Sequence, residues 1–294
     1  MRITANGLEF EVDEQGPADG EPLLMIMGLG MQLVAWPDEL VADLAARGFR
    51  VLRMDNRDIG LSAHLDHLGT PNLLRASLRH LLRLKVRSPY ALAAMAEDCV
   101  GVLDHLGIKR VHVCGASMGG MIAQHIAASH PERVKSLTLI MTSSGARHLP
   151  QAKAAVRRAL LSRPRGDDTE SRVVHALGVW RVIGSPGYPP DAARQRRRIE
   201  SSIRRAWHPA GVARQLVAIV ADGDRSSLLK QIVAPTRVIH GKDDPLVPVP
   251  AAHDLVKKIE HAVADIIPGM GHDLPEQLLP RVAAGIAENA GRSR

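Results

Sequence analysis

The sequence predicts an α/β fold with a mostly parallel central sheet flanked by helices. Short apolar runs alternate with longer segments of helical periodicity in the first half of the chain, and the alternation resumes after residue 235. Strands that alternate with helices are typical of βαβ units, in which neighbouring strands run parallel. The composition agrees, because 45% hydrophobic and 23% charged residues are ordinary for a globular protein.

The expected strands follow from apolar patterning. Residues 8–12 alternate apolar and acidic side chains, as in a strand with one buried face. Residues 22–27 (PLLMIM) form a continuous apolar run that ends at Gly28, which is typical of a buried strand. Other short apolar runs have the same interpretation, namely residues 49–54, 111–114, 134–141, 236–240 and 262–267.

The expected helices follow from apolar residues that recur at intervals of three and four. Residues 36–47 place Leu40 and Leu44 on one helical face, and Gly48 follows at the position where glycine commonly ends a helix. The same periodicity predicts helices over residues 90–106, 117–129 and 251–260, and a last one from about residue 278.

The alternation stops between residues 143 and 228, where the chain is rich in arginine, interrupted by proline and helical only in patches. A structureless loop of that length is uncommon inside a compact domain. We therefore expect residues 143–228 to form a helical cap, or lid, inserted into an α/β core of residues 1–142 and 229–294. A second insertion, residues 63–89, also carries leucine and arginine at helical spacing.

Charge and composition narrow the class of partner. Lysine and arginine number 38 against 31 acidic residues, which gives a net charge of +7, but aromatic residues are only 2%. Stacking platforms for nucleic-acid bases are therefore scarce, and we expect no nucleic-acid partner. Two cysteines, Cys99 and Cys114, no signal-peptide pattern and no membrane-length apolar run predict a soluble cytoplasmic protein. No oligomeric state is predicted.

Residues 115–119 (GASMG) match the G-x-S-x-G pattern, with an apolar strand before them and an apolar-faced helix after them. In that context the pattern indicates a nucleophile elbow, a sharp turn that lifts the hydroxyl of Ser117 above the sheet edge. The N–H of Met118 would then lie at a helix N-terminus, where it can bind developing negative charge. The alternative is a glycine-rich turn in which Ser117 is an ordinary helix N-cap.

A serine nucleophile needs a base that is oriented by an acid, and in this chain order the acid precedes the histidine. His272 follows the last expected strand inside a glycine-rich loop. Asp243 and Asp244 both follow the strand at 236–240, where ligand sites of open α/β sheets gather. Spacing alone leaves both aspartates open as the acid.

A second oxyanion donor is expected in the loop after the 22–27 strand, where Gly28 and Gly30 let the backbone approach a ligand closely. The donor would be the N–H of Leu29, and the alternative is a simple tight turn. The sequence shows no phosphate-binding loop and no cluster with metal-ligand spacing, so we expect no cofactor and no metal.

Together these residues resemble the α/β-hydrolase superfamily, and the similarity spans nearly the whole chain except the expected cap. Within it, the chain looks most similar to bacterial serine esterases of the aclacinomycin methylesterase-like group. The segments that carry the resemblance are residues 27–28, 36–40, 55–62, 115–120 and 130–134.

The resemblance implies an α/β-hydrolase fold and assigns roles that spacing left open. The family pattern G-x-x-D-x-x-V implies that the acid is Asp244, three residues after Gly241. It also supports His272 as the base, and Leu29 and Met118 as the residues whose N–H groups form the oxyanion hole. One departure is Met27, which stands where most of the superfamily has a histidine.

A serine at the elbow argues against the family members that use aspartate or cysteine, such as dehalogenases, epoxide hydrolases and dienelactone hydrolases. The resemblance implies a serine hydrolase that cleaves carboxylic esters through an acyl-enzyme, of carboxylesterase or lipase type, on small to medium acyl or methyl ester substrates. The alternatives are a thioesterase, a lactonase or a carbon–carbon bond hydrolase of the same fold. A non-catalytic ligand-binding protein is a remote alternative, because Ser117, Asp244 and His272 are all present.

Three further segments have competing interpretations. Residues 73–85 interleave leucine with arginine, and a lid helix with a solvated basic face is favoured over contact with a lipid surface. Residues 194–205 add charge within the cap. Residues 55–58 are expected to form an arginine–carboxylate network that holds a turn. The following residues are expected mainly in the core of the cap, with a few reaching substrate: Val173, Val174, Leu177, Val179, Trp180 and Ile183.

Overall fold

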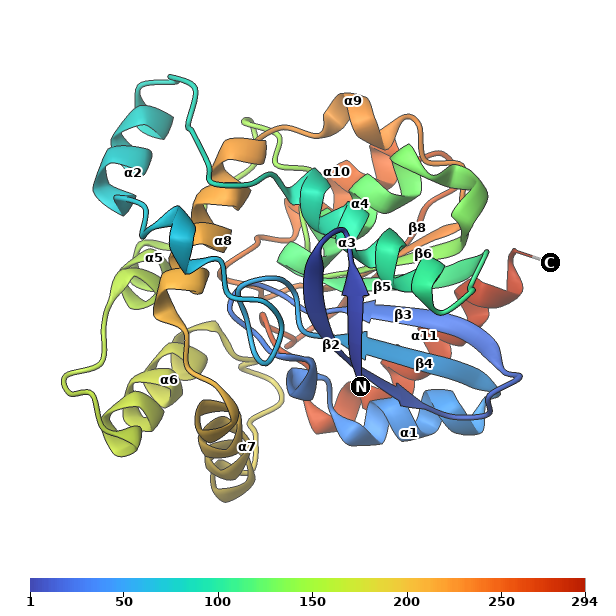
Figure 1. Cartoon of the computed structure of the whole chain (residues 1–294), viewed down its shortest axis with the longest axis horizontal. Coiled ribbons are helices and arrows are strands. Elements are labelled where there is room, and N and C mark those ends of the chain that lie inside the picture. The colour runs from blue at the N-terminus through green and yellow to red at the C-terminus, as the bar shows by residue number, and fades with distance from the viewer. Residues whose placement is uncertain (294) are drawn as a thin grey trace.

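The computed structural model describes residues 1–293 and contains one eight-stranded sheet with the strand order β1-β2-β4-β3-β5-β6-β7-β8 (Figure 1). Strands β1, β2 and β4 pair antiparallel, and every other neighbouring pair is parallel. The mostly parallel sheet predicted from the sequence is therefore confirmed. The strands are β1 (Arg2–Ala5), β2 (Leu8–Gln15), β3 (Glu21–Ile26), β4 (Phe49–Met54), β5 (Val111–Ala116), β6 (Val134–Ile140), β7 (Thr236–Gly241) and β8 (Val263–Ile267).

All seven expected strands are present, and β1 is an addition. It pairs with β2 through a hairpin whose turn residues, Asn6 and Gly7, have φ values of 52° and 76°. Asn-Gly is the strongest short-range hairpin signal, because both central residues of a type I′ turn need positive φ. The signal was present at these two residues, so β1 was predictable.

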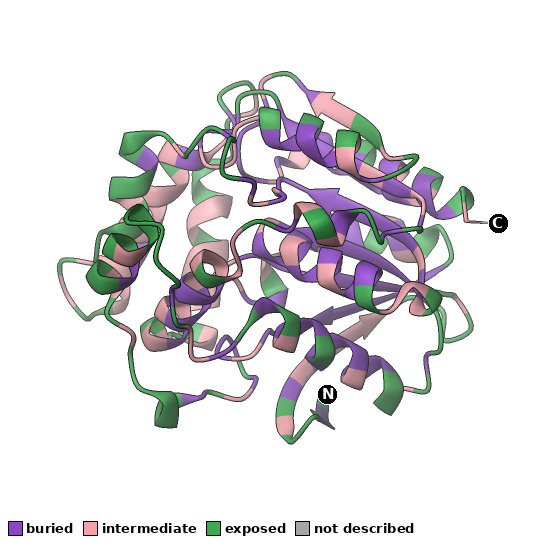
Figure 2. Cartoon of the chain, turned by 90° about the horizontal axis from the view of Figure 1, so that it is seen from above, coloured by how far each residue is buried: buried purple, intermediate pink, exposed green. Residues whose placement is uncertain are grey.

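Helices cover both faces of the sheet, and their buried sides form two apolar clusters (Figure 2). One cluster joins Leu103 of α3 and Ile126 of α4 to one face, and the other joins Leu40 of α1 and Ile286 of α11 to the opposite face. Because helices cover both faces of the sheet in this three-layer packing, the site lies at the ends of the strands. The helices are α1 (Asp38–Ala46), α3 (Leu92–His105), α4 (Met118–Ser129), α10 (Pro250–Lys258) and α11 (Leu279–Gly291).

Between β6 and β7 the described chain forms only helices. Helices α5 to α8 lie beyond the end of the sheet toward which β3 and β4 point (Figure 1), whereas α9 lies beside α4 and α10. Helix α8 also contacts α2 from the earlier insertion. No helix among residues 1–293 combines the length and the apolarity that crossing a bilayer requires. The helices between β6 and β7 are α5 (Ala154–Leu161), α6 (Thr169–Ile183), α7 (Ala192–Arg205), α8 (Pro209–Asp222) and α9 (Ser226–Leu229). The helix of the earlier insertion is α2 (Leu73–Leu81), and the short 3₁₀ turns are η1 (Leu33–Ala35), η2 (Asp66–Leu68), η3 (Pro131–Arg133) and η4 (Glu276–Leu278).

The turn after β4 joins these helices to the sheet through buried ion pairs. Arg214 of α8 donates from Nη2 to Oδ1 of Asp58 at 2.6 Å and from Nε to Oδ2 at 2.8 Å, and neither side chain is exposed. Asp55 accepts a 2.7 Å hydrogen bond from Arg205 of α7. Arg57 pairs with Asp98 of α3. Residues 55–58 thus hold two helices of the insertion against the sheet.

Candidate functional site

Ser117 is the single residue between the end of β5 and the start of α4. Its φ of 54° and ψ of −118° are rare for a residue with a side chain. A Cβ at Gly119 would lie 2.0 Å from the carbonyl oxygen of Ile26, and one at Gly115 would lie 2.3 Å from the carbonyl oxygen of Gly119. Only glycine therefore allows this sharp turn. The Ser117 side chain makes no capping hydrogen bond to α4, which disfavours the N-cap interpretation.

Three of the expected site residues form one hydrogen-bonded line. Oγ of Ser117 lies 3.0 Å from Nε2 of His272, and Nδ1 of His272 lies 2.7 Å from Oδ2 of Asp244. A carboxylate only accepts hydrogen bonds, so we assign the imidazole proton to Nδ1, and Nε2 then faces the serine hydroxyl as an acceptor. The Asp244 side chain is fully buried and that of His272 is 7% exposed, whereas Ser117 is partly exposed.

The two neighbouring aspartates have different partners. Oδ1 of Asp244 accepts the backbone N–H groups of Leu246 and Val247, each at 2.8 Å. Asp243 instead accepts the N–H of Gly269 at 2.7 Å. The structure therefore brings Asp244, and not Asp243, to the histidine.

A second buried histidine, His240, lies behind Asp244. Its Nε2 is 2.7 Å from the carbonyl oxygen of Val247 and 3.6 Å from Oδ2 of Asp244. Burial lowers the pKa of His240, so the ring stays neutral and donates its Nε2–H to Val247. No local pattern marks this residue, which is the penultimate residue of β7 and one of 14 histidines.

The expected oxyanion loop passes directly against Ser117. A Cβ at Gly28 would lie 3.1 Å from Cβ of Ser117. Nδ2 of Asn56 donates to the carbonyl oxygen of Met27 at 3.0 Å, which fixes the peptide that enters the loop. Within residues 1–293, the N–H groups of Leu29 and Met118 donate to no protein acceptor, so both remain available to a ligand.

Two buried glutamines, Gln32 and Gln215, connect this loop to α7 and α8. Oε1 of Gln215, on α8, accepts the N–H of Gly30 at 3.0 Å. Nε2 of Gln32 donates to the carbonyl oxygen of Ser202, on α7, at 2.7 Å, and its Oε1 accepts from Arg205 at 2.7 Å. Glutamine is usually exposed, and its long-range partners leave no local sequence signal, so the sequence analysis missed both residues.

The last residue of α6 and the chain that follows it bind the loop that carries His272. The N–H of His272 donates to the carbonyl oxygen of Ile183 at 2.8 Å, and the N–H of Gly271 donates to Oγ of Ser185 at 2.8 Å. The hydroxyl of Ser185 donates in turn to Asp273. Burial raises the pKa of Asp273, although the hydrogen bond from Ser185 opposes that rise. Segments between β6 and β7 therefore contact both loops that flank Ser117.

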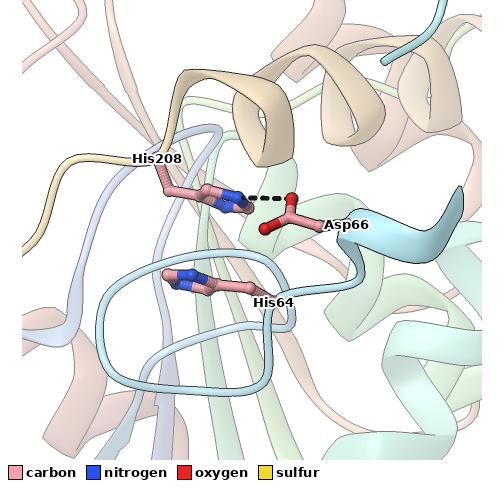
Figure 3. A group of neighbouring side chains, drawn as sticks. All are labelled: His64, Asp66 and His208. Carbon is pink, nitrogen blue, oxygen red and sulfur yellow. Dashed lines mark hydrogen bonds and ion pairs between the residues drawn. The ribbon is translucent and has the colours of Figure 1, made fainter. Parts of the chain in front are cut away.

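One group of side chains has the composition of a metal site. Ligand atoms of His64, Asp66 and His208 lie within 4.8 Å of one another (Figure 3). The two imidazole rings stack with centroids 3.8 Å apart and planes 4° apart, so their in-plane lone pairs do not converge on one point. Nδ1 of His208 is 2.8 Å from the carbonyl oxygen of Asp58, and its Nε2 is 2.8 Å from Oδ1 of Asp66. This geometry fits a junction between α8 and the turn after β4 better than a metal centre.

The chain matches a protein family and several known relatives. A family model described as the alpha/beta hydrolase fold matches residues 21–277. The rhodomycin D methylesterase DauP of Streptomyces sp. (strain C5) is 30% identical over 292 residues, which cover 92% of this chain and 90% of that protein. A putative carbamate hydrolase, RutD of Variovorax paradoxus (strain S110), is 30% identical over 272 residues, covering 90% of this chain and 89% of that protein.

Solved structures share the fold. A meta-cleavage product hydrolase from Pseudomonas fluorescens IP01 superimposes with a TM-score of 0.75 at 20% identity, covering 100% of this chain and 98% of that chain.

Proposed function

This chain belongs to the alpha/beta hydrolase family, and from that premise we propose that it cleaves carboxylic esters by way of Ser117, His272 and Asp244. It is a hydrolase acting on ester bonds, and its substrates are small molecules. The observation that carries the proposal is the unbroken hydrogen-bonded line from a strained, partly exposed serine to a buried carboxylate. A line of this kind is the arrangement that activates a hydroxyl as a nucleophile.

In the proposed reaction, Oγ of Ser117 attacks the ester carbonyl carbon while Nε2 of His272 takes the hydroxyl proton. Asp244 keeps the proton on Nδ1 and stabilises the imidazolium that forms. The tetrahedral oxyanion accepts hydrogen bonds from the N–H groups of Leu29 and Met118. The intermediate expels the alcohol, which takes the proton from His272. His272 then deprotonates a water molecule, which attacks the acyl carbonyl carbon. The bond between that carbon and Oγ of Ser117 breaks, Oγ takes the proton back from His272, and the acid is released.

The position of the helical insertion supports a cap. We propose that residues 143–228 form a lid over a core of residues 1–142 and 229–294, because α7, α8 and the chain after α6 contact the loops beside Ser117. Of the residues expected in the cap core, Val173 is fully buried and Ile183 is 7% exposed, whereas Val174 is 56% exposed. The apolar side chains of α6, which are aliphatic except for Trp180, support small to medium acyl groups or methyl esters as substrates.

The test is hydrolysis of a series of p-nitrophenyl esters from acetate to palmitate, with a methyl ester measured alongside. The Ser117→Ala variant should lose up to about 10⁶-fold in kcat. Ser129→Ala, at the exposed end of the same helix, is the matched control and should keep wild-type turnover. Turnover of Ser117→Ala near the wild-type rate would contradict the proposal. Turnover of a thioester or lactone, with none on any of these esters, would change the proposed substrate class but not the proposed nucleophile.

A further inference from the structure

The outer face of α2 carries large apolar side chains that are mostly exposed to solvent. Leu74 is 84% exposed, Leu78 is 56% exposed and Leu81 is 77% exposed. Leu82 and Leu84, in the chain that follows, are 58% and 51% exposed. Single exposed leucines are common on soluble proteins, but a group of five is the kind of patch that marks an interaction site. We refer to these five leucines as the leucine face.

The direction of the leucine face follows from helical geometry. Ala76 is buried against Val217 of α8, which identifies the side of α2 that packs on the protein. Leu74, Leu78 and Leu81 stand at intervals of four and three, so they share one side of the helix, and that side is opposite Ala76. In Figure 1, α2 lies at the outer edge of the molecule, remote from the sheet. The leucines therefore point away from the protein.

Positive charge surrounds this face without acidic neighbours in sequence. The chain from residue 67 to residue 96 contains no aspartate or glutamate, and Arg75, Arg83 and Lys85 are exposed. None of these three residues forms an ion pair among the residues that the structure describes. Arg79 donates from Nε to the carbonyl oxygen of Lys85 at 2.8 Å and also lacks a carboxylate partner within residues 1–293.

The other arginine-rich helix, α7, is different. Arg194 pairs with Glu39 and Glu276, Arg196 pairs with Glu170, and Arg205 pairs with Asp55. Much of the positive charge of α7 is therefore neutralised by ion pairs within the protein. Arg75, Arg79, Arg83 and Lys85, beside the leucine face, have no such ion pair within residues 1–293.

We propose that α2 and the loop after it form a docking surface for an anionic lipid bilayer. Leucines that point outward enter the boundary between headgroups and acyl chains, while arginine and lysine bind the anionic headgroups. Long basic side chains suit this position, because their apolar stems lie along the membrane and their charges reach the headgroups. The proposal is independent of the proposed ester chemistry, since it uses no residue of the Ser117 site.

The experiment is co-sedimentation of the full chain with vesicles of phosphatidylcholine alone and with vesicles that also contain phosphatidylglycerol. Wild-type protein should bind the anionic vesicles. Part of that binding should persist in 1 M salt, where the Debye length falls to about 3 Å and surface charges are screened. Replacing Leu74, Leu78 and Leu81 by glutamine should abolish the salt-resistant part. Replacing Arg75, Arg79 and Arg83 by glutamine should weaken binding at low salt by about fivefold per residue.

A charge-matched control carries Lys109→Gln, Arg110→Gln and Lys257→Gln, three exposed positions remote from α2 in sequence. It loses the same net charge and should bind anionic vesicles like the wild type. Unfolding temperatures of all variants verify that each one folds. No wild-type binding at low salt, or equal loss of binding in the control, would overturn the proposal. So would a change from dimer to monomer in the leucine variant, because the face would then bind a second copy.

Discussion

The backbone N–H of Gly30 donates a 3.0 Å hydrogen bond to Oε1 of Gln215, which lies 185 residues further along the chain. Gln215 is fully buried, and its Nε2 donates to the carbonyl oxygen of Arg57 at 2.9 Å. One side-chain amide therefore connects α8, the turn after β4 and the loop that carries the N–H of Leu29. The position of an expected oxyanion donor depends on a helix of the insertion.

This relationship predicts that Gln215→Leu lowers kcat while KM changes little. Losing the acceptor leaves the N–H of Gly30 unpaired and lets the loop move, so the N–H of Leu29 is less well aligned with the oxyanion. Removal of an oxyanion donor itself costs about 10²–10³ in kcat. Displacing one should cost less, about tenfold. Steady-state kinetics with an ester that the wild type hydrolyses measure the effect on kcat and KM.

The exposed Gln277 provides a matched control, because Gln277→Leu makes the same chemical change away from this loop. It should leave kcat unchanged. If Gln215→Leu raises KM and leaves kcat intact, the amide contributes to substrate binding and does not position the oxyanion loop.

The two neighbouring aspartates give a second prediction. Asp244→Asn should lower kcat by about 10⁴, because an amide at this position favours the wrong imidazole tautomer. Asp243→Asn should cost far less, since the side chain of Asp243 binds the N–H of Gly269 and, within residues 1–293, does not contact His272. The comparison is made with purified variants on one ester. The reverse ranking would show that the acid is Asp243.

The parts of the site that depend on local backbone chemistry could be predicted from the sequence. Gly115 and Gly119 flank Ser117 because a side chain at either position would collide with backbone atoms, and this requirement is visible as a motif. The choice of Asp244 over Asp243 came from family resemblance. Its physical reason, the N–H groups of Leu246 and Val247 that orient the carboxylate, required coordinates.

The residues that the sequence analysis missed act across long separations. Ser185 reaches a loop 86 residues away, and Gln215 reaches one 185 residues away. Periodicity detects which face of an element is apolar, but it does not identify the partner of a buried polar group. Helix α2 shows the same limit, because the spacing of leucine and arginine in residues 73–85 did not reveal which side of α2 faces the protein.

Ser185 gives a third prediction. Ser185→Ala removes the acceptor of the Gly271 N–H and the donor to the buried Asp273, so the loop that carries His272 should loosen. We expect kcat to fall about tenfold, which corresponds to about 1.4 kcal/mol of barrier. Ser185→Thr keeps the hydroxyl and should restore most of the loss. Ser162→Ala, at an exposed position of the insertion, is the control. Equal activity of Ser185→Ala and Ser162→Ala would contradict a positioning role for Ser185.

A fourth prediction concerns stability and pH at the buried pair of Arg214 and Asp58. Burial by itself raises the pKa of Asp58, but hydrogen bonds from the guanidinium and from the N–H of Leu65 outweigh it and lower that pKa. A lowered pKa contributes stability that is present above the pKa of the unfolded state, about 3.9, and is lost as pH falls through the folded value. Arg214→Met should cost about 3–5 kcal/mol in the free energy of unfolding at neutral pH, because it leaves a buried carboxylate uncompensated.

The sign of the pH dependence separates this mechanism from simple loss of packing. Without Arg214, burial dominates and raises the pKa of Asp58. Protonation of Asp58 should therefore restore part of the stability that the Arg214→Met variant loses. Its deficit relative to wild type should therefore shrink as pH is lowered toward about 4, where wild type starts to lose the contribution of the pair. Adding Asp58→Asn should also restore part of the stability at neutral pH, because the buried charge is gone. Urea unfolding at both pH values measures each free energy. A deficit that is independent of pH and unchanged by Asp58→Asn would mean that Arg214 stabilises the junction through its packing and not through its charge.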